Sequence, residues 1–351
     1  MSSFLQQLLN GLVLGSMYAL IALGYTMVYG VLRLINFAHG DVYMFGAFMG
    51  YYLSRQIKGS GEGSLFYALV IMLGSMLLSA TLGIFIERFA YRPGRSGARY
   101  AMAFWLAILG AVLGYFVDPS PVAMIGGAIV AAGVGFVVER SLIQRIPRAS
   151  RLALLILAIG VSMFLENAGQ LVFGADPKFF PQIISATQLN IGSLSINNQQ
   201  IVVFVMAIIL MVLLTAIVNY TRTGKAMRAT AFNLDAAKLM GINTDRIIAA
   251  TFALGSALAA AAGILVSLNY PKIDPLMGIM PGLKAFVAAV LGGIGNIPGA
   301  MLGGFIIGIA EVMVVGYLQS TYRDAIAFTI LILILLLKPA GIMGKGLVEK
   351  V

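Results

Sequence analysis

The sequence predicts an all-α polytopic membrane protein, and three observations support this fold class. The chain has 351 residues, of which 60% are hydrophobic and only 10% are charged, and its mean hydropathy is +0.97. Long apolar runs alternate with clusters of Lys and Arg, and a run of about 20 apolar residues can cross the hydrocarbon core as a helix. Glycine occurs 41 times, which is typical of closely packed membrane helices. A soluble domain, with about 25% charged residues, is excluded.

The apolar runs place the expected spans in order along a single domain, 1–351. Because the short runs either cross the membrane or pack inside protein, we expect about 8–11 transmembrane helices. The first 32 residues contain no Lys or Arg, so the first run is expected to be a retained span rather than a signal peptide. The expected spans are 4–31, 41–57, 64–86, 101–117, 121–138, 152–173, 199–219, 246–268, 284–295, 298–318 and 324–337.

The segment 284–304 is expected to be a short broken or re-entrant helix packed inside protein. It is rich in glycine and carries Pro298 at its centre, and irregular backbone is not tolerated where it faces lipid. A phosphate cradle is the less favoured alternative, because no P-loop pattern follows the glycines. A second special region is 100–150, where two apolar runs joined by Asp118-Pro119-Ser120-Pro121 predict an inserted helical hairpin.

The basic residues predict the orientation of the chain. The net charge of +10 could indicate nucleic acid, but most of the 23 Lys and Arg residues fall into the connections between spans. Under alternating topology these connections share one side, which the positive-inside rule assigns to the cytoplasm. We therefore expect a multi-pass membrane protein with its N-terminus outside and its C-terminus inside. The groups are Arg33, Arg88–Arg99, Arg140–Arg151, Arg222–Arg246 and Lys338–Lys350.

Catalytic chemistry is missing from the sequence. The chain has no Cys and a single His, which argues against a thiolate or histidine metal site. No P-loop, zinc-protease motif, nucleophile elbow or dinucleotide fingerprint occurs. We expect no enzyme activity and no cofactor, so any active transport would take its energy from a partner or from an ion gradient.

Polar residues inside the apolar runs are the candidates for the translocation path. Asp324, at the start of 324–337, is the least favoured of three candidate carboxylates. Glu166 lies beside Asn167, and Glu311 lies within 298–318. Each carboxylate has two interpretations: a substrate or proton site near mid-membrane, or a group bonded to neighbouring helices at the outer end of a span. Asn36 and His39 precede the second span, where a polar turn at the cytoplasmic rim is favoured over a substrate contact.

The segment 222–246 is expected to be a structured cytoplasmic loop. Asn233 can cap a short helix that ends near Met240, Asp235 is favourable in its first turn, and Gly241 stands where a left-handed glycine ends a helix. Leu234, Ala237 and Met240 would form an apolar ridge. Such a ridge fits either a groove in a partner protein or the lipid interface.

Several motifs resemble those of the LivH-type permeases of branched-chain amino acid importers. Asp235-Ala236-Ala237-x-x-x-Gly241 is similar to the E-A-A-x-x-x-G coupling loop of bacterial ABC permeases, with Asp in place of Glu. The resemblance covers nearly the whole chain, although the usual family member lacks the 100–150 hairpin. The other matching runs are Asn10–Leu20, Leu34–Asp41, Glu87–Pro93, Ile159–Asn167, Gly224–Ala229 and Gly292–Ala300.

The resemblance implies a type II ABC importer-like permease in the bacterial inner membrane. It implies cytoplasmic ATPase subunits that contact Asn233, Leu234, Asp235, Ala236, Ala237, Met240 and Gly241, a second identical or related permease subunit, and a periplasmic solute-binding protein. The implied solutes are branched-chain amino acids, and urea or a short amide would suit a close relative. Two other hypotheses are an ion-coupled secondary carrier that uses Glu166 or Glu311, and a passive channel.

Overall fold

A computed structural model describes residues 2–57, 64–92, 151–185, 187–191 and 194–344. The chain divides into two compact units, the first comprising Met1–Gly83 and Ser162–Val351 and the second Ile84–Val161. The predicted hairpin at 100–150 lies outside the described residues and stays a prediction. All the sites described below belong to the first unit.

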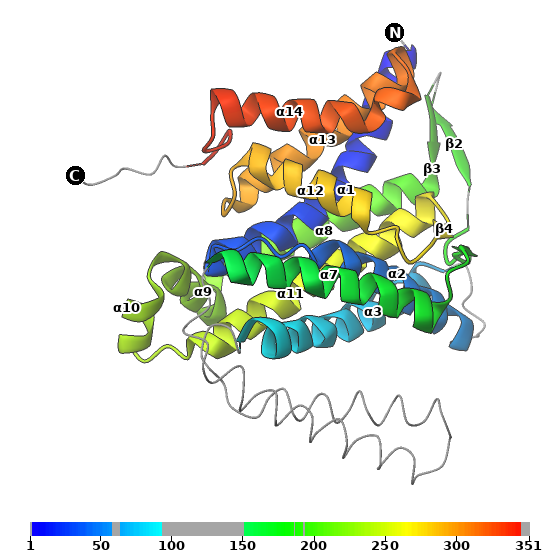
Figure 1. The fold of residues 1–351 in the computed structure, drawn as a ribbon. Helices are drawn as coiled ribbons and strands as arrows, with labels where there is room; N and C mark the ends of the chain where they lie inside the picture. Colours follow the sequence, from blue (N-terminus) through cyan, green and yellow to red (C-terminus); the bar gives the residue numbers. More distant parts are fainter. Residues whose placement is uncertain (1, 58–63, 93–150, 186, 192–193, 345–351) are drawn as a thin grey trace. The chain divides into compact units, whose positions relative to one another are not determined.

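Helices make up most of the described chain (Figure 1). Helices α3 (Leu65–Ile86) and α7 (Arg151–Phe173) each cross the boundary between the units, and the π-helical turn η1 (Glu87–Tyr91) follows α3. The first unit also contains α1 (Ser2–Leu32), α2 (His39–Gln56), α8 (Asn198–Tyr220), α9 (Arg222–Phe232), α10 (Leu234–Leu239), α11 (Thr244–Asn269), α12 (Ile279–Gly292), α13 (Ile297–Tyr317), the 3-10 turn η3 (Ser320–Tyr322) and α14 (Arg323–Leu337).

The expected spans within the described residues are all helical, which confirms the fold class. Seven of these described helices are long and apolar enough to cross a membrane, namely α1, α3, α7, α8, α11, α13 and the helix Ser320–Leu337 that includes η3 and α14. Helix α2 is not among the seven, since it carries His39, Asp41 and Arg55. Helix α12 has 14 residues, about 21 Å, which is too short to cross the roughly 30 Å core alone.

Helix α1 is the central helix of the first unit. The most apolar stretch of this helix is almost wholly buried, and the helix packs against α8, α11, α12 and α13. The contact with α13 is backbone against backbone. A Cβ added at Gly15 would lie 2.8 Å from the Cα of Phe305, and one added at Gly308 would lie 2.3 Å from the Cα of Gly15. Glycine on both helices therefore sets how closely they approach.

A single methyl group at this contact is expected to destabilise the fold. Gly308→Ala should lower the free energy of unfolding by about 1–3 kcal/mol, because the added Cβ meets backbone that cannot rotate away. Gly160→Ala in α7 is the matched control, since its Cβ meets no atom within 4 Å and alanine is the better helix former by up to about 1 kcal/mol. Thermal unfolding of the two purified variants in detergent should move in opposite directions, and equal behaviour would contradict this account of the contact.

The glycine-rich run between α12 and α13 forms a tight turn between two helices. Gly293 and Gly295 have positive φ angles of 104° and 91°, a conformation that favours glycine. The side chain of Asn296 caps α13 by accepting a hydrogen bond from Gly299 N at 3.1 Å. Beyond the turn the helices touch, since a Cβ at Gly303 would lie 2.0 Å from the Ala288 carbonyl oxygen. The break expected within 284–304 is therefore this turn, and its glycines serve close helix packing.

Short strands lie at one end of the first unit, and α9 and α10 lie at the other (Figure 1). Strand β1 (Lys178–Phe179) pairs antiparallel with β4 (Lys272–Ile273), and β2 (Gln188–Ile191) pairs antiparallel with β3 (Leu194–Asn197). The Gln6 side chain fixes β3 to α1 through two hydrogen bonds with the backbone of Ser195, at 2.9 and 3.0 Å. Among the described residues, the strands and the segment 222–246, which is expected in the cytoplasm, thus occupy opposite ends (Figure 1).

Candidate functional site

The first candidate site is the α9–α10 segment at the end opposite the strands. Thr221 begins α9, and its hydroxyl accepts a hydrogen bond from Gly224 N at 3.0 Å. Gly224 lies against the end of α8, where a Cβ would stand 2.3 Å from the carbonyl oxygens of Ile217 and Val218. Arg228, one turn further along α9, donates a hydrogen bond to the Val218 carbonyl of α8. Helix α9 also packs against α1 and α11, so it is joined directly to the central helix.

Helix α10 is short but closed at both ends, as the sequence predicts. The Asn233 side chain accepts hydrogen bonds from the backbone N–H groups of Asp235 and Ala236, both at 3.0 Å. At the other end Gly241 has φ +82°. Gly241 N donates to Lys238 O and Ile242 N donates to Ala237 O, each at 3.0 Å, which is the Schellman pattern. The backbone of this one-and-a-half-turn helix is therefore held rigidly.

The exposed apolar surface of this segment differs from the predicted ridge. Ala237 is only 4% exposed, so it packs inward, whereas Phe232, Leu239 and Met240 are more than four-fifths exposed. Spacing alone placed Ala237 on the ridge, but the contact of α10 with α9 and α11 turns that face toward the protein. Asp235 and Ala236 remain exposed. We call Phe232, Leu239 and Met240 the α10 surface.

Loss of the Asn233 cap should loosen α10 without unfolding the protein. Asn233→Ala removes the acceptor for two backbone N–H groups, which costs about 1 kcal/mol. Hydrogen exchange at the amides of Asp235 and Ala236 should become roughly five-fold faster, since local opening then costs less. Asn233→Ser, which keeps a capping oxygen, should exchange almost as the parent does. Unchanged exchange in Asn233→Ala would show that the cap does not hold this helix.

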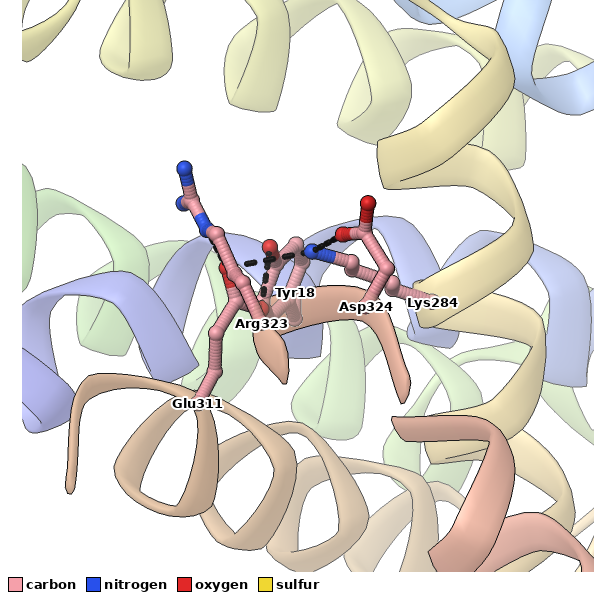
Figure 2. Close-up of polar contacts among 5 residues, drawn as sticks. All are labelled: Tyr18, Lys284, Glu311, Arg323 and Asp324. Atoms are coloured by element: carbon pink, nitrogen blue, oxygen red, sulfur yellow. Dashed lines mark hydrogen bonds and ion pairs between the residues drawn. The ribbon is translucent and has the colours of Figure 1, made fainter. Parts of the chain in front are cut away.

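The second candidate site is a buried cluster of charges that joins four helices (Figure 2). Glu311 on α13 is completely buried. One of its oxygens accepts a hydrogen bond from the Tyr18 hydroxyl of α1 at 2.8 Å. The other contacts the ammonium of Lys284 from α12 at 3.1 Å and the guanidinium Nε of Arg323 from α14. Lys284 also pairs with Asp324 at 2.7 Å, so two cations balance two anions.

A cavity of about 320 Å³ lies beside this cluster. Glu311 and Arg323 are the charged residues in its lining, and the rest is a mixture of carboxamide, hydroxyl and aliphatic groups. These groups come from the strand-bearing ends of α1, α8, α11, α13 and α14. The other lining residues are Gln7, Asn10, Val13, Leu14, Gln200, Asn269, Tyr270, Val312, Val315 and Ser320.

For Glu311 the geometry matches the second of the two interpretations, a carboxylate bonded to neighbouring helices. Apart from Asp324, which pairs in the same cluster, the remaining candidates from the sequence do not join it. Asn167 is exposed and donates to the Met163 carbonyl of its own helix at 2.7 Å, and Glu166 is half-buried on the same helix. The candidates for the path therefore do not form one site.

The turn between α1 and α2 buries its polar candidates Asn36 and His39, while Arg33 is exposed. His39 is the first residue of α2 and lies edge-on to the Tyr25 ring, with ring centres 4.7 Å apart. Its Nε2 has no hydrogen-bond partner among the described residues. Asn36 accepts a hydrogen bond from His39 N through its main-chain carbonyl, and Ala38 stands at the N-cap of α2. Asn36 thus shapes the turn through its backbone.

Sequence reasoning missed most of the cluster. Lys284 was a detectable signal, because it is the one charge in the apolar stretch 279–292 and such residues mark functional or paired positions. Arg323 begins α14 and gave no signal by spacing, since it lies 12 residues from Glu311. Asp41 was also missed: it is buried in α2 and accepts a hydrogen bond from the Ser162 hydroxyl at 2.5 Å.

Comparison with known proteins assigns the chain to a family. The family described as "Branched-chain amino acid transport system / permease component" matches residues 7–120 and 96–335. The permease protein LivH of the high-affinity branched-chain amino acid transport system of Salmonella typhimurium is 40% identical over 99% of this chain and 98% of its own length. LivH of Escherichia coli K12 shows the same values, and BraD of Pseudomonas aeruginosa is 38% identical over the same shares.

Partial matches extend to permeases for other solutes. The xylose transport permease XylH of Escherichia coli is 37% identical over 24% of each chain. No solved structure matches the chain. The full-length identity agrees with the resemblance carried by the coupling-loop and glycine motifs, and the chain belongs to the family of permease components of branched-chain amino acid transport systems.

Proposed function

We propose that this chain is the membrane-spanning subunit of an ATP-driven importer that passes branched-chain amino acids into the cytoplasm. The observation that carries the proposal is the 40% identity to LivH permeases over the full length of both chains. In this proposal ATPase subunits supply the energy, a periplasmic binding protein delivers the solute, and a second permease subunit, identical or related, completes the pore.

The α9–α10 segment is the proposed contact for the ATPase. The α10 surface presents Phe232, Leu239 and Met240 to a partner, and an apolar helix face of this kind fits a protein groove. Both ends of α10 are capped, so a movement of the ATPase would displace α10 as a rigid element instead of unwinding it. Because α9 packs against α1 and α11, this movement reaches the helices at the centre of the first unit. This would switch the pore between outward-open and inward-open states.

The proposed orientation places α9 and α10 in the cytoplasm and the strands outside, in the bacterial inner membrane. The C-terminal end of α14 lies at the same end of the first unit as α9 and α10 (Figure 1). The basic residues of 222–246 and Lys338 therefore gather at one end, as the positive-inside rule requires. The strand-bearing end would receive the binding protein.

Reconstituted transport tests the proposal. The chain is co-expressed with permease, ATPase and binding-protein subunits of a branched-chain amino acid importer, and the assembly is placed in liposomes with ATP enclosed. We expect uptake of labelled leucine that requires ATP and survives an uncoupler. Uptake that fails without a proton gradient and ignores ATP would favour the ion-coupled carrier, and uptake of urea or a short amide in place of leucine would change the solute.

A further inference from the structure

The guanidinium group of Arg323 contacts the charge cluster through one nitrogen and leaves its other two nitrogens available to the cavity. Its Nε donates to Glu311, and its two terminal nitrogens point away from the cluster (Figure 2). Among the described residues, these two nitrogens have no hydrogen-bond partner. The side chain is 43% exposed and lines the cavity. A planar pair of guanidinium donors matches the two oxygens of a carboxylate.

The rest of the lining supplies complementary groups. Gln200 is oriented by the capping box of α8, in which its Oε1 accepts a hydrogen bond from Asn197 N at 3.2 Å. Its amide nitrogen is thereby left as a donor. Gln7 and Asn269 bring carboxamide oxygens that can accept hydrogen bonds from an ammonium group. The apolar part of the lining includes Val312 and Val315.

The charge balance decides what kind of ligand fits. Arg323 is compensated by Glu311, and Lys284 by Asp324 and Glu311. A net anion or a net cation would therefore bring an uncompensated charge into a site that is already neutral, which is costly away from water. A zwitterion brings equal and opposite charges. The volume of about 320 Å³ is at the lower end of the range for small-molecule sites.

We propose that this cavity binds one zwitterionic α-amino acid with an apolar side chain. The ligand carboxylate lies on the terminal nitrogens of Arg323, its ammonium group lies among the carboxamide oxygens, and its side chain contacts the valines. Glu311 is a positioning residue that holds Arg323. The inference rests on the proposed function, and it adds a solute-binding site within the permease itself, at the end where delivery would occur.

Binding to the purified full chain in phosphatidylcholine nanodiscs tests the proposal, with ligand-detected NMR titration as the readout. L-Leucine is compared with L-leucinamide, which lacks the carboxylate. We expect leucine to bind about 10-fold tighter, since charge-assisted hydrogen bonds are lost in the amide. Arg323→Lys keeps a cation for Glu311 but loses the planar fork, so it should weaken leucine about 10-fold and remove the preference over leucinamide.

Two further variants keep the test independent of the cluster. Val315→Trp, at an exposed position of the lining, should weaken both ligands by filling the cavity. Tyr317→Trp adds bulk at an exposed position of the same helix that does not line the cavity, and it should leave leucine binding within about two-fold of the parent. Normal leucine binding in both Arg323→Lys and Val315→Trp would overturn the proposal. So would binding that vanishes in nanodiscs of anionic phosphatidylglycerol, because a lipid headgroup would then be the occupant.

The two proposals can fail separately. If the complete transporter imports leucine but the chain shows no Arg323-dependent binding, the cavity is not a solute site and the proposed function stands. If the complete transporter does not import leucine although the chain binds it through Arg323, the proposed function is wrong and the cavity assignment stands.

Discussion

Replacing Lys284 by methionine is expected to destabilise the protein by about 3 kcal/mol. The ammonium of Lys284 is almost completely buried and contacts both Glu311 and Asp324. Methionine fills a similar volume but brings no charge, so Asp324 loses its partner and Glu311 keeps only Arg323 and Tyr18. Removing one member of a buried ion pair costs about 3–5 kcal/mol because the partner charge is left uncompensated. Because Glu311 keeps these two contacts, the expected loss in the free energy of unfolding lies at the lower end of this range.

Thermal stability of the detergent-solubilised protein measures the effect. We expect the apparent Tm of Lys284→Met to fall by roughly 4 °C. Lys272→Met is the matched control, because Lys272 is exposed in β4 and a surface change of this kind stays within about 0.5 kcal/mol. The double variant Lys284→Met/Glu311→Gln should recover part of the loss, since groups in one ionic network couple by about 0.5–3 kcal/mol. Equal losses in the two lysine variants would show that the cluster does not stabilise the fold.

Local signals in the sequence predicted the helices and the capped segment well. Seven of the nine expected spans in the described residues are long and apolar enough to cross a bilayer, because length and composition alone decide this. The other two, 41–57 and 284–295, are the more polar helix α2 and the short helix α12. The ends of α10 were predictable for a similar reason. Asn233 and Gly241 each act on backbone groups within four residues, so the pattern contains the whole interaction.

Long-range features could not be predicted in the same way. The partners of Glu311 come from α1, α12 and α14, and Tyr18 is 293 residues distant in the sequence. No spacing rule connects such positions, and the single charge of Lys284 in an apolar stretch was the one sequence signal that indicated a buried cluster. The burial of Ala237 depends on how α10 packs against its neighbours. Arg33 has φ 55° after α1, a conformation usually taken by glycine, and nothing in its neighbourhood in the sequence predicts it.

Gly241→Val is expected to reduce ATP-dependent leucine uptake by the complete transporter at least 10-fold while the permease still folds. The φ angle of +82° at this position is strained for any residue with a Cβ and most strained for a β-branched one, at about 1–2 kcal/mol or more. A Cβ here meets no atom within 4 Å. The cost therefore falls on the backbone of the turn, where the bonds from Gly241 to Lys238 and from Ile242 to Ala237 would be lost.

The control for this variant is Gly241→Asn, because asparagine tolerates the left-handed conformation better than other residues with a side chain. It should keep most of the uptake, whereas Gly241→Val should leave ATP hydrolysis running without transport. This contrast separates conformation from size, since both side chains extend into open space. If Gly241→Val couples hydrolysis to uptake as the parent does, α10 cannot be the rigid element that carries the motion. The force would then enter the permease elsewhere, and the apolar residues of the α10 surface would need another partner.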